Sequence, residues 1–270
     1  MLKMKNYFIR SFFLIIVIIG LKVTVAHAQE KELLLKILTY NIHHANPPSK
    51  PALIDLNAIA KVINEKKPDL VALQEVDVNN RRSGTELDQA AELGRLTGMH
   101  HFFVKGIDYE GGAYGIAILS KSPILNVDSL RLPMAEGSGG EPRVLAVVTV
   151  EPERGRSISF ACTHLDLKEQ NRILQSAAIS GKLNQYKHPV ILCGDFNAKP
   201  GSDVINYFDQ HFSRTKVEGA AAFTIPEKNP DREIDFVMYK PKAAFKQKKH
   251  LVIQEPYASD HLPVYVELAF

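Results

Sequence analysis

Apolar runs with a strand-like composition recur along this 270-residue chain, and five of them end on a short polar motif. In chain order the motifs are Thr-Tyr-Asn at 39–41, Leu-Gln-Glu at 73–75, Thr-His-Leu-Asp at 163–166, Gly-Asp-Phe-Asn at 194–197 and Ser-Asp-His at 259–261. Strands of one sheet system end at common rims, so we expect these polar clusters to gather at one rim. An active site can be built in this way.

The spacing of apolar residues predicts helices between the strands. Leu56, Ile59, Ala60 and Ile63 recur at helical spacing, and a second helix is expected from Leu87 until Gly98, where Thr85 and Asp88 resemble a capping pair. A third is expected over 167–183. Strands are expected over 33–40, 70–73, 101–104, 114–119, 124–130, 144–150, 158–163, 190–193, 234–239 and 264–269. This alternation favours two packed sheets with helices outside, because each element must bury one apolar face.

The first 28 residues are typical of a secretory signal peptide. Lys3, Lys5 and Arg10 precede a short apolar stretch, and the small residues Ala26 and Ala28 suit a cleavage site. The apolar stretch is shorter than the roughly 20 residues that cross a bilayer, so an uncleaved anchor is the less favoured interpretation. We therefore expect a secreted or periplasmic protein, with residues 29–270 forming one catalytic domain and no membrane span after cleavage.

The charge of the expected mature chain is close to neutral. Four of the 33 Lys and Arg residues lie within 1–28, which hold no acidic residue, so 29 basic residues face 30 acidic ones. Such a balance lacks the general basic surface with which proteins neutralise nucleic-acid phosphates. One lysine-rich run, at 240–249, is interpreted as a solvated hairpin rather than a ligand site.

Only two cysteines occur, each two residues before a polar motif residue. Cys162 precedes His164 and Cys193 precedes Asp195, so each thiol should share a strand face with that residue. Two buried thiols are the favoured interpretation, and a disulfide remains the alternative if the strands are neighbours. Zinc-type Cys and His spacing is absent from the sequence, which disfavours a soft-metal site.

The polar residues suit hydrolysis of a phosphoester. Glu75, with Asn41 and Asp260, offers the oxygen ligands that Mg²⁺ prefers, and Mn²⁺ is the alternative. The Asp195 carboxylate could orient or deprotonate water while the Asn197 amide holds a phosphoryl oxygen. Two histidines could donate to the phosphoryl group, with Asp235 as an orienting carboxylate. They are His164 and His261.

In their order, these motifs resemble those of the endonuclease/exonuclease/phosphatase superfamily, over essentially the whole mature chain. The resemblance implies a four-layer α/β/β/α sandwich of two mixed, mainly antiparallel sheets flanked by helices, and a Mg²⁺-dependent phosphoester hydrolase. It also implies roles: Glu75, Asn41 and Asp260 hold the metal, Asp195 positions water, and Asn197 with His164 contacts phosphate. Asp235 orients His261 as a phosphoryl-stabilising dyad. Shorter motifs, at 39–44 and 114–120, resemble a bacterial branch of metal-dependent hydrolases.

Substrate contacts are less sharply predicted. Arg143 resembles a position at which family nucleases contact phosphate, and His43 could line the site; each could equally be an exposed loop residue. Arg81 could hold a second anionic group, although an exposed basic residue is the favoured interpretation. Family deoxyribonucleases have an arginine two positions after the metal-binding glutamate, where this chain has Asp77. The chain also has no tryptophan, the best residue for stacking bases.

Together these features predict a monomeric phosphoesterase. The favoured substrate is a small phosphorylated molecule or a phosphodiester headgroup, which leaves monoester and diester open. An extracellular nuclease of the same fold is the enzymatic alternative, and a non-catalytic binding protein is a less favoured one.

Overall fold

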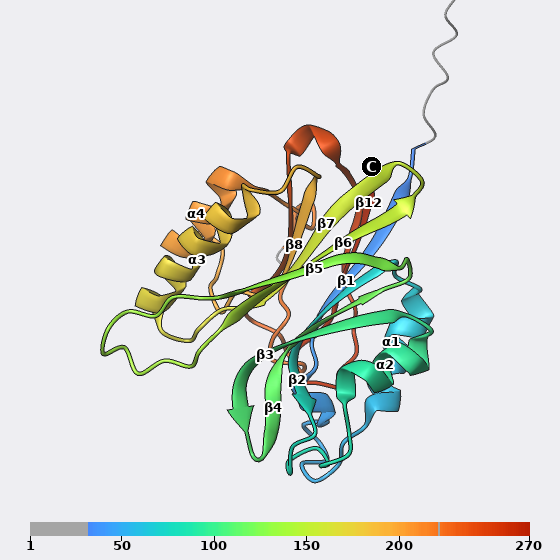
Figure 1. Cartoon of the computed structure of the whole chain (residues 1–270), viewed down its shortest axis with the longest axis vertical. Helices are drawn as coiled ribbons and strands as arrows, with labels where there is room; N and C mark the ends of the chain where they lie inside the picture. The colour runs from blue at the N-terminus through green and yellow to red at the C-terminus, as the bar shows by residue number, and fades with distance from the viewer. Residues whose placement is uncertain (1–31, 221) are drawn as a thin grey trace, which may run out of the picture. The chain divides into compact units, whose positions relative to one another are not determined.

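A computed structural model describes residues 32–220 and 222–270, which belong to one compact unit. Two six-stranded sheets stack face to face, and a pair of helices covers the outer face of each (Figure 1). The signal-peptide prediction falls on residues 1–28, outside this description. Within the described part, no helix is both long and apolar enough to span a bilayer.

The first sheet has the strand order β11-β12-β1-β2-β4-β3, and the second has β5-β6-β7-β8-β10-β9. Neighbouring strands are parallel only for β1 with β2 and β7 with β8, so both sheets are mixed and mainly antiparallel. This is the four-layer sandwich that the sequence resemblance implied, and it confirms that prediction. The strands are β1 (Leu34–Asn41), β2 (Leu70–Val78), β3 (His100–Tyr109), β4 (Gly112–Ser120), β5 (Ile124–Arg131), β6 (Val144–Glu153), β7 (Arg156–His164), β8 (Val190–Asp195), β9 (Ser213–Arg214), β10 (Asp235–Lys240), β11 (Lys246–Val252) and β12 (Val264–Ala269).

Three apolar layers hold the sandwich together, because each sheet buries both of its faces. The central layer lies between the sheets and includes Ile37, Phe160 and Val266. A second layer packs α1 and α2 against the first sheet, and a third packs α3 and α4 against the second. The helices are α1 (Leu56–Lys66), α2 (Gln89–Thr97), α3 (Glu169–Leu183) and α4 (Asp203–His211), with the 3-10 turns η1 (His43–Ala45) and η2 (Lys242–Ala244).

Side-chain caps define where three helices begin. Asp55, Asp88 and Ser202 each accept a hydrogen bond from the backbone N–H three residues ahead, which would otherwise lack a partner. The α2 cap is Asp88 itself, and the helix ends at Gly98 with φ of 66°. Only a left-handed residue fits this C-terminal position, and glycine adopts it at little cost.

Helix α4 and strand β11 were not predicted from the sequence, nor were the two-residue strand β9 and the two 3-10 turns. Helix α4 is only nine residues long and buries three apolar side chains, Val204, Ile205 and Phe208. Strand β11 lies within the lysine-rich run that was interpreted as a solvated hairpin. It pairs with β12 at the edge of the first sheet while Lys246, Lys248 and Lys249 remain exposed.

Strand register places the polar motifs opposite one another. His164 pairs with Asp195 across β7 and β8, and Asp235 pairs with Asp195 across β10 and β8. The same register sets Cys162 beside Cys193, and both thiols are buried and free. Because the two parallel strands end together, the side chains at their carboxyl ends share one rim of the sandwich.

Candidate active site

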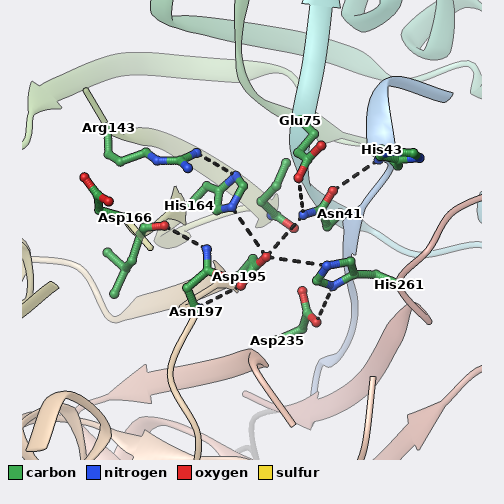
Figure 2. Close-up of polar contacts among 12 residues, drawn as sticks. Asn41, His43, Glu75, Arg143, His164, Asp166, Asp195, Asn197, Asp235 and His261 are labelled. Carbon is green, nitrogen blue, oxygen red and sulfur yellow. Dashed lines mark hydrogen bonds and ion pairs between the residues drawn. The ribbon is translucent and has the colours of Figure 1, made fainter. Parts of the chain in front are cut away.

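The Asp195 carboxylate lies at the centre of the polar cluster, where side chains from both sheets converge (Figure 2). It is almost fully buried. Its Oδ2 atom is 3.2 Å from Asn41 Nδ2, 3.4 Å from His164 Nε2 and 3.7 Å from His261 Nε2. Burial and the nearby charge of Asp235 raise the pKa of Asp195, against the opposing effect of His261. A carboxylate with a raised pKa is suited to accept a proton from water near neutral pH.

His261 and Asp235 form a buried dyad. Their Nδ1 and Oδ2 atoms are 2.8 Å apart. Burial alone would lower the pKa of His261, but the Asp235 carboxylate and its hydrogen bond, with Asp195 and Asp260, raise that pKa to about 10. The imidazole is therefore held as a cation whose Nε2–H points toward the Asp195 side of the cluster, as the sequence analysis expected of an oriented histidine.

Thr224 is a member of the cluster that the sequence analysis missed. Its hydroxyl donates to Asp235 Oδ2 over 2.5 Å, and its main-chain oxygen accepts from Leu262 N over 2.6 Å. The threonine thus fastens the carboxylate and the His261 loop together. It lies in an irregular segment far from any motif, so no pattern in the sequence marks it.

His164 has a different second partner. Its Nδ1 atom is 3.1 Å from Nη1 of Arg143, a guanidinium that is itself buried beside Glu141. Burial, the Arg143 charge and the His261 charge lower the pKa of His164 well below its ordinary value. His164 is therefore neutral, and its Nε2 atom faces Asp195 Oδ2 at 3.4 Å without the charge of an ion pair.

Asn41 bridges the two carboxylates expected to serve metal and water. Its Nδ2 atom is 3.0 Å from Glu75 Oε1 and donates to Asp195 as well. Its Oδ1 atom accepts the backbone N–H of His43 over 3.1 Å. A backbone N–H can only donate, so the amide orientation is fixed, and in this arrangement Asn41 aligns Glu75 with Asp195. Its role as a metal ligand stays a prediction.

Glu75 projects into the site because the backbone bulges beneath it. The pairing of β2 with β4 shifts register between Gln74 and Val76, and Glu75 has a φ of 59°. A non-glycine residue in the left-handed region is uncommon, and bulges with this geometry re-aim side chains next to active sites. The bulge leaves the Glu75 side chain half-buried at the rim.

Asp260 and Asn197 complete the cluster. Asp260 is half-buried, and the neighbouring Ser259 hydroxyl donates to the main-chain oxygen of Asn41 over 2.7 Å. Asn197 has a φ of 47°, donates its backbone N–H to Asp195 Oδ1, and donates its amide to the Leu165 oxygen over 2.9 Å. The bond to Leu165 uses one amide N–H, and donation of the other N–H to a phosphoryl oxygen stays a prediction.

The donor atoms suit a hard divalent cation. Oxygen atoms of Glu75, Asp195, Asp235 and Asp260 concentrate negative charge here, and both cysteine thiols lie in the core. Ligand atoms of Asp195, Asp235 and His261 lie within 4.8 Å of one another. However, the His261 Nδ1 atom and the Asp235 carboxylate already bind each other. Glu75 and Asp260 are therefore the better candidates for metal ligands. Hard oxygen ligands of this kind are those of Mg²⁺ and Mn²⁺.

A family model described as Endonuclease/Exonuclease/phosphatase family matches residues 38–261, a span that contains every residue of the cluster. The chain belongs to this family. Members of the endonuclease/exonuclease/phosphatase family are generally hydrolases that act on phosphoester bonds. The family identity confirms the resemblance drawn from the motifs.

Relatives of the chain in this family include a bacterial protein and solved structures. The chain is 27% identical to the uncharacterized protein YbhP of Escherichia coli K12 over 259 residues, which cover 89% of this chain and 98% of YbhP. An endonuclease/exonuclease/phosphatase from Beutenbergia cavernae has a TM-score of 0.73 at 25% identity, covering 88% of this chain and 72% of that one. A mannosyl-6-phosphatase from Bacteroides thetaiotaomicron has a TM-score of 0.70 at 20% identity, covering 87% and 100%.

Asp77 stands where family deoxyribonucleases have an arginine, but its side chain does not face a substrate. An acidic residue in place of the arginine of family deoxyribonucleases would repel a nucleic-acid backbone if its charge were exposed. Instead it is fully buried, accepts two hydrogen bonds from Arg82 over 2.8 and 2.9 Å, and accepts a third from Ser83 over 2.6 Å. Its charge is neutralised internally, so Asp77 gives no argument against a nucleic-acid substrate.

The remaining predicted substrate residues differ in their burial and in their contacts. His43 is half-buried, with Nδ1 2.9 Å from the Asn46 oxygen and its ring 4.5 Å from that of His44. Arg81 is exposed next to Asn80. Arg143 is buried against His164, rather than exposed on a loop as the alternative had it. Contacts of these three residues with substrate stay predictions.

Proposed function

We propose that this chain is a secreted or periplasmic phosphoesterase that depends on Mg²⁺, or on Mn²⁺ in its place. The observation that carries the proposal is the pair of opposed groups at Asp195. A buried carboxylate able to accept a proton lies within 3.7 Å of the Nε2 atom of His261, an imidazole that Asp235 holds protonated. Phosphoryl transfer needs an aligned water and fixed positive charge, and these groups offer both.

Each residue has a defined part in this mechanism. Asp195 orients the attacking water and accepts its proton, while the His261 cation stabilises negative charge that develops on the phosphoryl oxygens. Asn41 keeps Asp195 and Glu75 aligned. Glu75 and Asp260 would hold the cation, which when bound polarises a phosphoryl oxygen and neutralises its charge.

The favoured substrate class is a small phosphorylated molecule or a phosphodiester headgroup. Support comes from the near-neutral charge expected of the mature chain and from its lack of tryptophan, since nucleic-acid binding relies on clustered cations and base stacking. A mannosyl-6-phosphatase shares the fold, which places sugar phosphates in any first panel. An extracellular nuclease is the second candidate. The Asp77 charge is paired with Arg82 inside the protein, so it does not disfavour a nucleic-acid substrate. A non-catalytic binding protein is disfavoured, because no central motif residue is missing.

A substrate panel tests the proposal. Purified chain lacking residues 1–28 is stripped with EDTA and assayed on phosphomonoesters, phosphodiesters and DNA before and after Mg²⁺ is restored. We expect turnover that returns with the metal and disappears in Asp195→Asn and His261→Gln. His188→Gln, at an exposed histidine, serves as the matched control. Absence of metal-restored turnover on every substrate would contradict the proposal.

A further inference from the structure

The two histidines beside Asp195 have opposite second partners. On His261 the Nδ1 atom faces the Asp235 carboxylate at 2.8 Å, whereas on His164 the Nδ1 atom faces the Arg143 guanidinium at 3.1 Å (Figure 2). Both rings turn Nε2 toward the same Asp195 oxygen. The difference between an anionic and a cationic partner divides the roles of these two rings.

The chemistry of arginine decides the state of His164. A guanidinium carries five N–H donors and no acceptor, so a ring nitrogen in contact with it must accept. The Nδ1 atom of His164 therefore carries no proton, and the proton of the neutral ring is on Nε2, facing the Asp195 carboxylate at 3.4 Å. We propose that Arg143 is a positioning residue that fixes His164 as the neutral tautomer with its proton on Nε2.

Arg143 is anchored well enough to impose this state. Its side chain is 9% exposed, and Nη1 also pairs with Glu141 Oε1 at 3.0 Å. Its main-chain oxygen accepts the N–H of Leu132 over 2.9 Å, where the loop between β5 and β6 begins and ends. The burial of the guanidinium and the hydrogen bond of its backbone both hold this side chain against His164.

The loop that leads to Arg143 is fastened to the start of α3. Asn171 is fully buried, accepts the Ala135 N–H over 2.8 Å, and donates to Ser138 Oγ and to Asp166 Oδ2 over 3.0 and 2.9 Å. Gly140 packs so tightly there that a Cβ atom would lie 2.1 Å from Asp166 Oδ2. Supporting contacts of this kind hold an active-site side chain within a narrow range of positions.

The proposed function gives the tautomer its importance, and the kinetic part of this inference rests on that function. With its proton on Nε2, His164 donates toward Asp195 or a phosphoryl oxygen and supplies no second positive charge. Without Arg143 the ring is free to carry its proton on Nδ1. Its Nε2 lone pair would then face the carboxylate, an arrangement of two acceptors that displaces the ring or Asp195. The neutral His164 and the cationic His261 are therefore not interchangeable.

Imidazole ¹⁵N NMR of the mature chain tests the tautomer without any assay of activity. Spectra are recorded for the wild type, Arg143→Met and Arg143→Lys, with His164→Asn to assign the resonance and the exposed Arg154→Met as control. We expect a protonated Nε2 and an unprotonated Nδ1 on His164 in the wild type and in Arg154→Met. Arg143→Lys keeps a donor and should retain this pattern, whereas Arg143→Met should lose it.

Turnover measured on the same proteins distinguishes positioning from substrate contact. Loss of a group that orients a catalytic residue typically lowers activity about 10–100-fold, and we expect this loss in kcat of Arg143→Met with KM near the wild-type value. If Arg143→Met raises KM while His164 keeps its proton on Nε2, the inference is overturned. A wild-type His164 that carries its proton on Nδ1, or on both nitrogens, overturns it whatever the variants do, even if the chain turns over no substrate in the panel.

Discussion

The Ser259 hydroxyl donates to the main-chain oxygen of Asn41 over 2.7 Å, although 218 residues separate the two in the chain. The same hydroxyl oxygen lies 3.3 Å from the N–H of His261, which it can accept. One buried serine therefore joins the end of β1 to the loop that carries Asp260 and His261. This contact links the first motif of the chain to the last.

Ser259→Ala should weaken both stability and turnover. Removing a partner from a buried hydrogen bond costs about 1–3 kcal/mol, and we expect the free energy of unfolding to fall within this range. Urea denaturation of the mature chain measures it. Ser49→Ala, at an exposed loop residue, is the matched control. A Ser259→Ala protein as stable and active as this control would show that the link does not hold the loop.

Arg82→Met should destabilise the fold strongly. It leaves the buried Asp77 carboxylate without its bidentate partner, and breaking a buried pair in this way costs about 3–5 kcal/mol. Asp77→Asn combined with Arg82→Met removes the unpaired charge and should recover part of the loss. A double-mutant cycle on the midpoint of urea unfolding measures the coupling. Additive effects of the two changes would mean that the two side chains do not depend on each other.

His250 should make the fold sensitive to acid. Burial and the charge of Arg214 lower the pKa of this histidine to about 4 in the folded state, and its Nε2 atom is buried without a hydrogen-bond partner in the described structure. The unfolded side chain has a pKa near ~6.5. Between these values the unfolded state binds more protons, so stability is complete above pH ~6.5 and falls as the pH drops toward 4.

His250→Leu tests this dependence. The folding free energies of wild type and variant are compared between pH 7.5 and pH 4.5. We expect the wild type to lose about 2–3 kcal/mol more than the variant over this window, since one pKa unit corresponds to about 1.4 kcal/mol. The exposed His188→Leu should behave as wild type. Parallel pH curves for wild type and His250→Leu would exclude His250 as the cause.

Glu75→Gln should raise the metal requirement if the proposed function holds. The substitution keeps the side-chain shape and one oxygen but removes the charge that a divalent cation favours. After EDTA treatment and Mg²⁺ titration, we expect the half-maximal Mg²⁺ concentration to rise at least ~10-fold, because even outer-shell changes cost about that much. Glu86→Gln, at an exposed glutamate, is the control. An unchanged titration would remove Glu75 from the metal site.

Most of the site could be predicted from the sequence because its motif residues lie at strand ends that the strand register brings together. His164, Asp195 and Asp235 each stand at a strand terminus, so a correct list of strands already brings them together. The resemblance to a family supplied the layer order, which periodicity alone did not. Asp235 and His261 were paired correctly because a histidine near a carboxylate is a recurring arrangement.

Other features depend on contacts that no local pattern encodes. The Glu75 bulge is a backbone irregularity of one residue, and Thr224 reaches Asp235 across an irregular segment. Asp77 was misinterpreted because its position relative to Glu75 suggested exposure, whereas the partner that buries it, Arg82, lies five residues further on. Burial of a charge is decided by its partner, and the sequence does not show which way either side chain turns.

Strand β11 has a consequence for how copies of this protein behave at high concentration. An edge strand exposes unpaired backbone groups that could accept a strand from another molecule and extend the sheet. Here Lys246, Lys248 and Lys249 stand along that edge, so two copies aligned edge to edge would bring like charges together. This like-charge repulsion disfavours strand addition at the β11 edge, and it does not depend on the chemistry at Asp195.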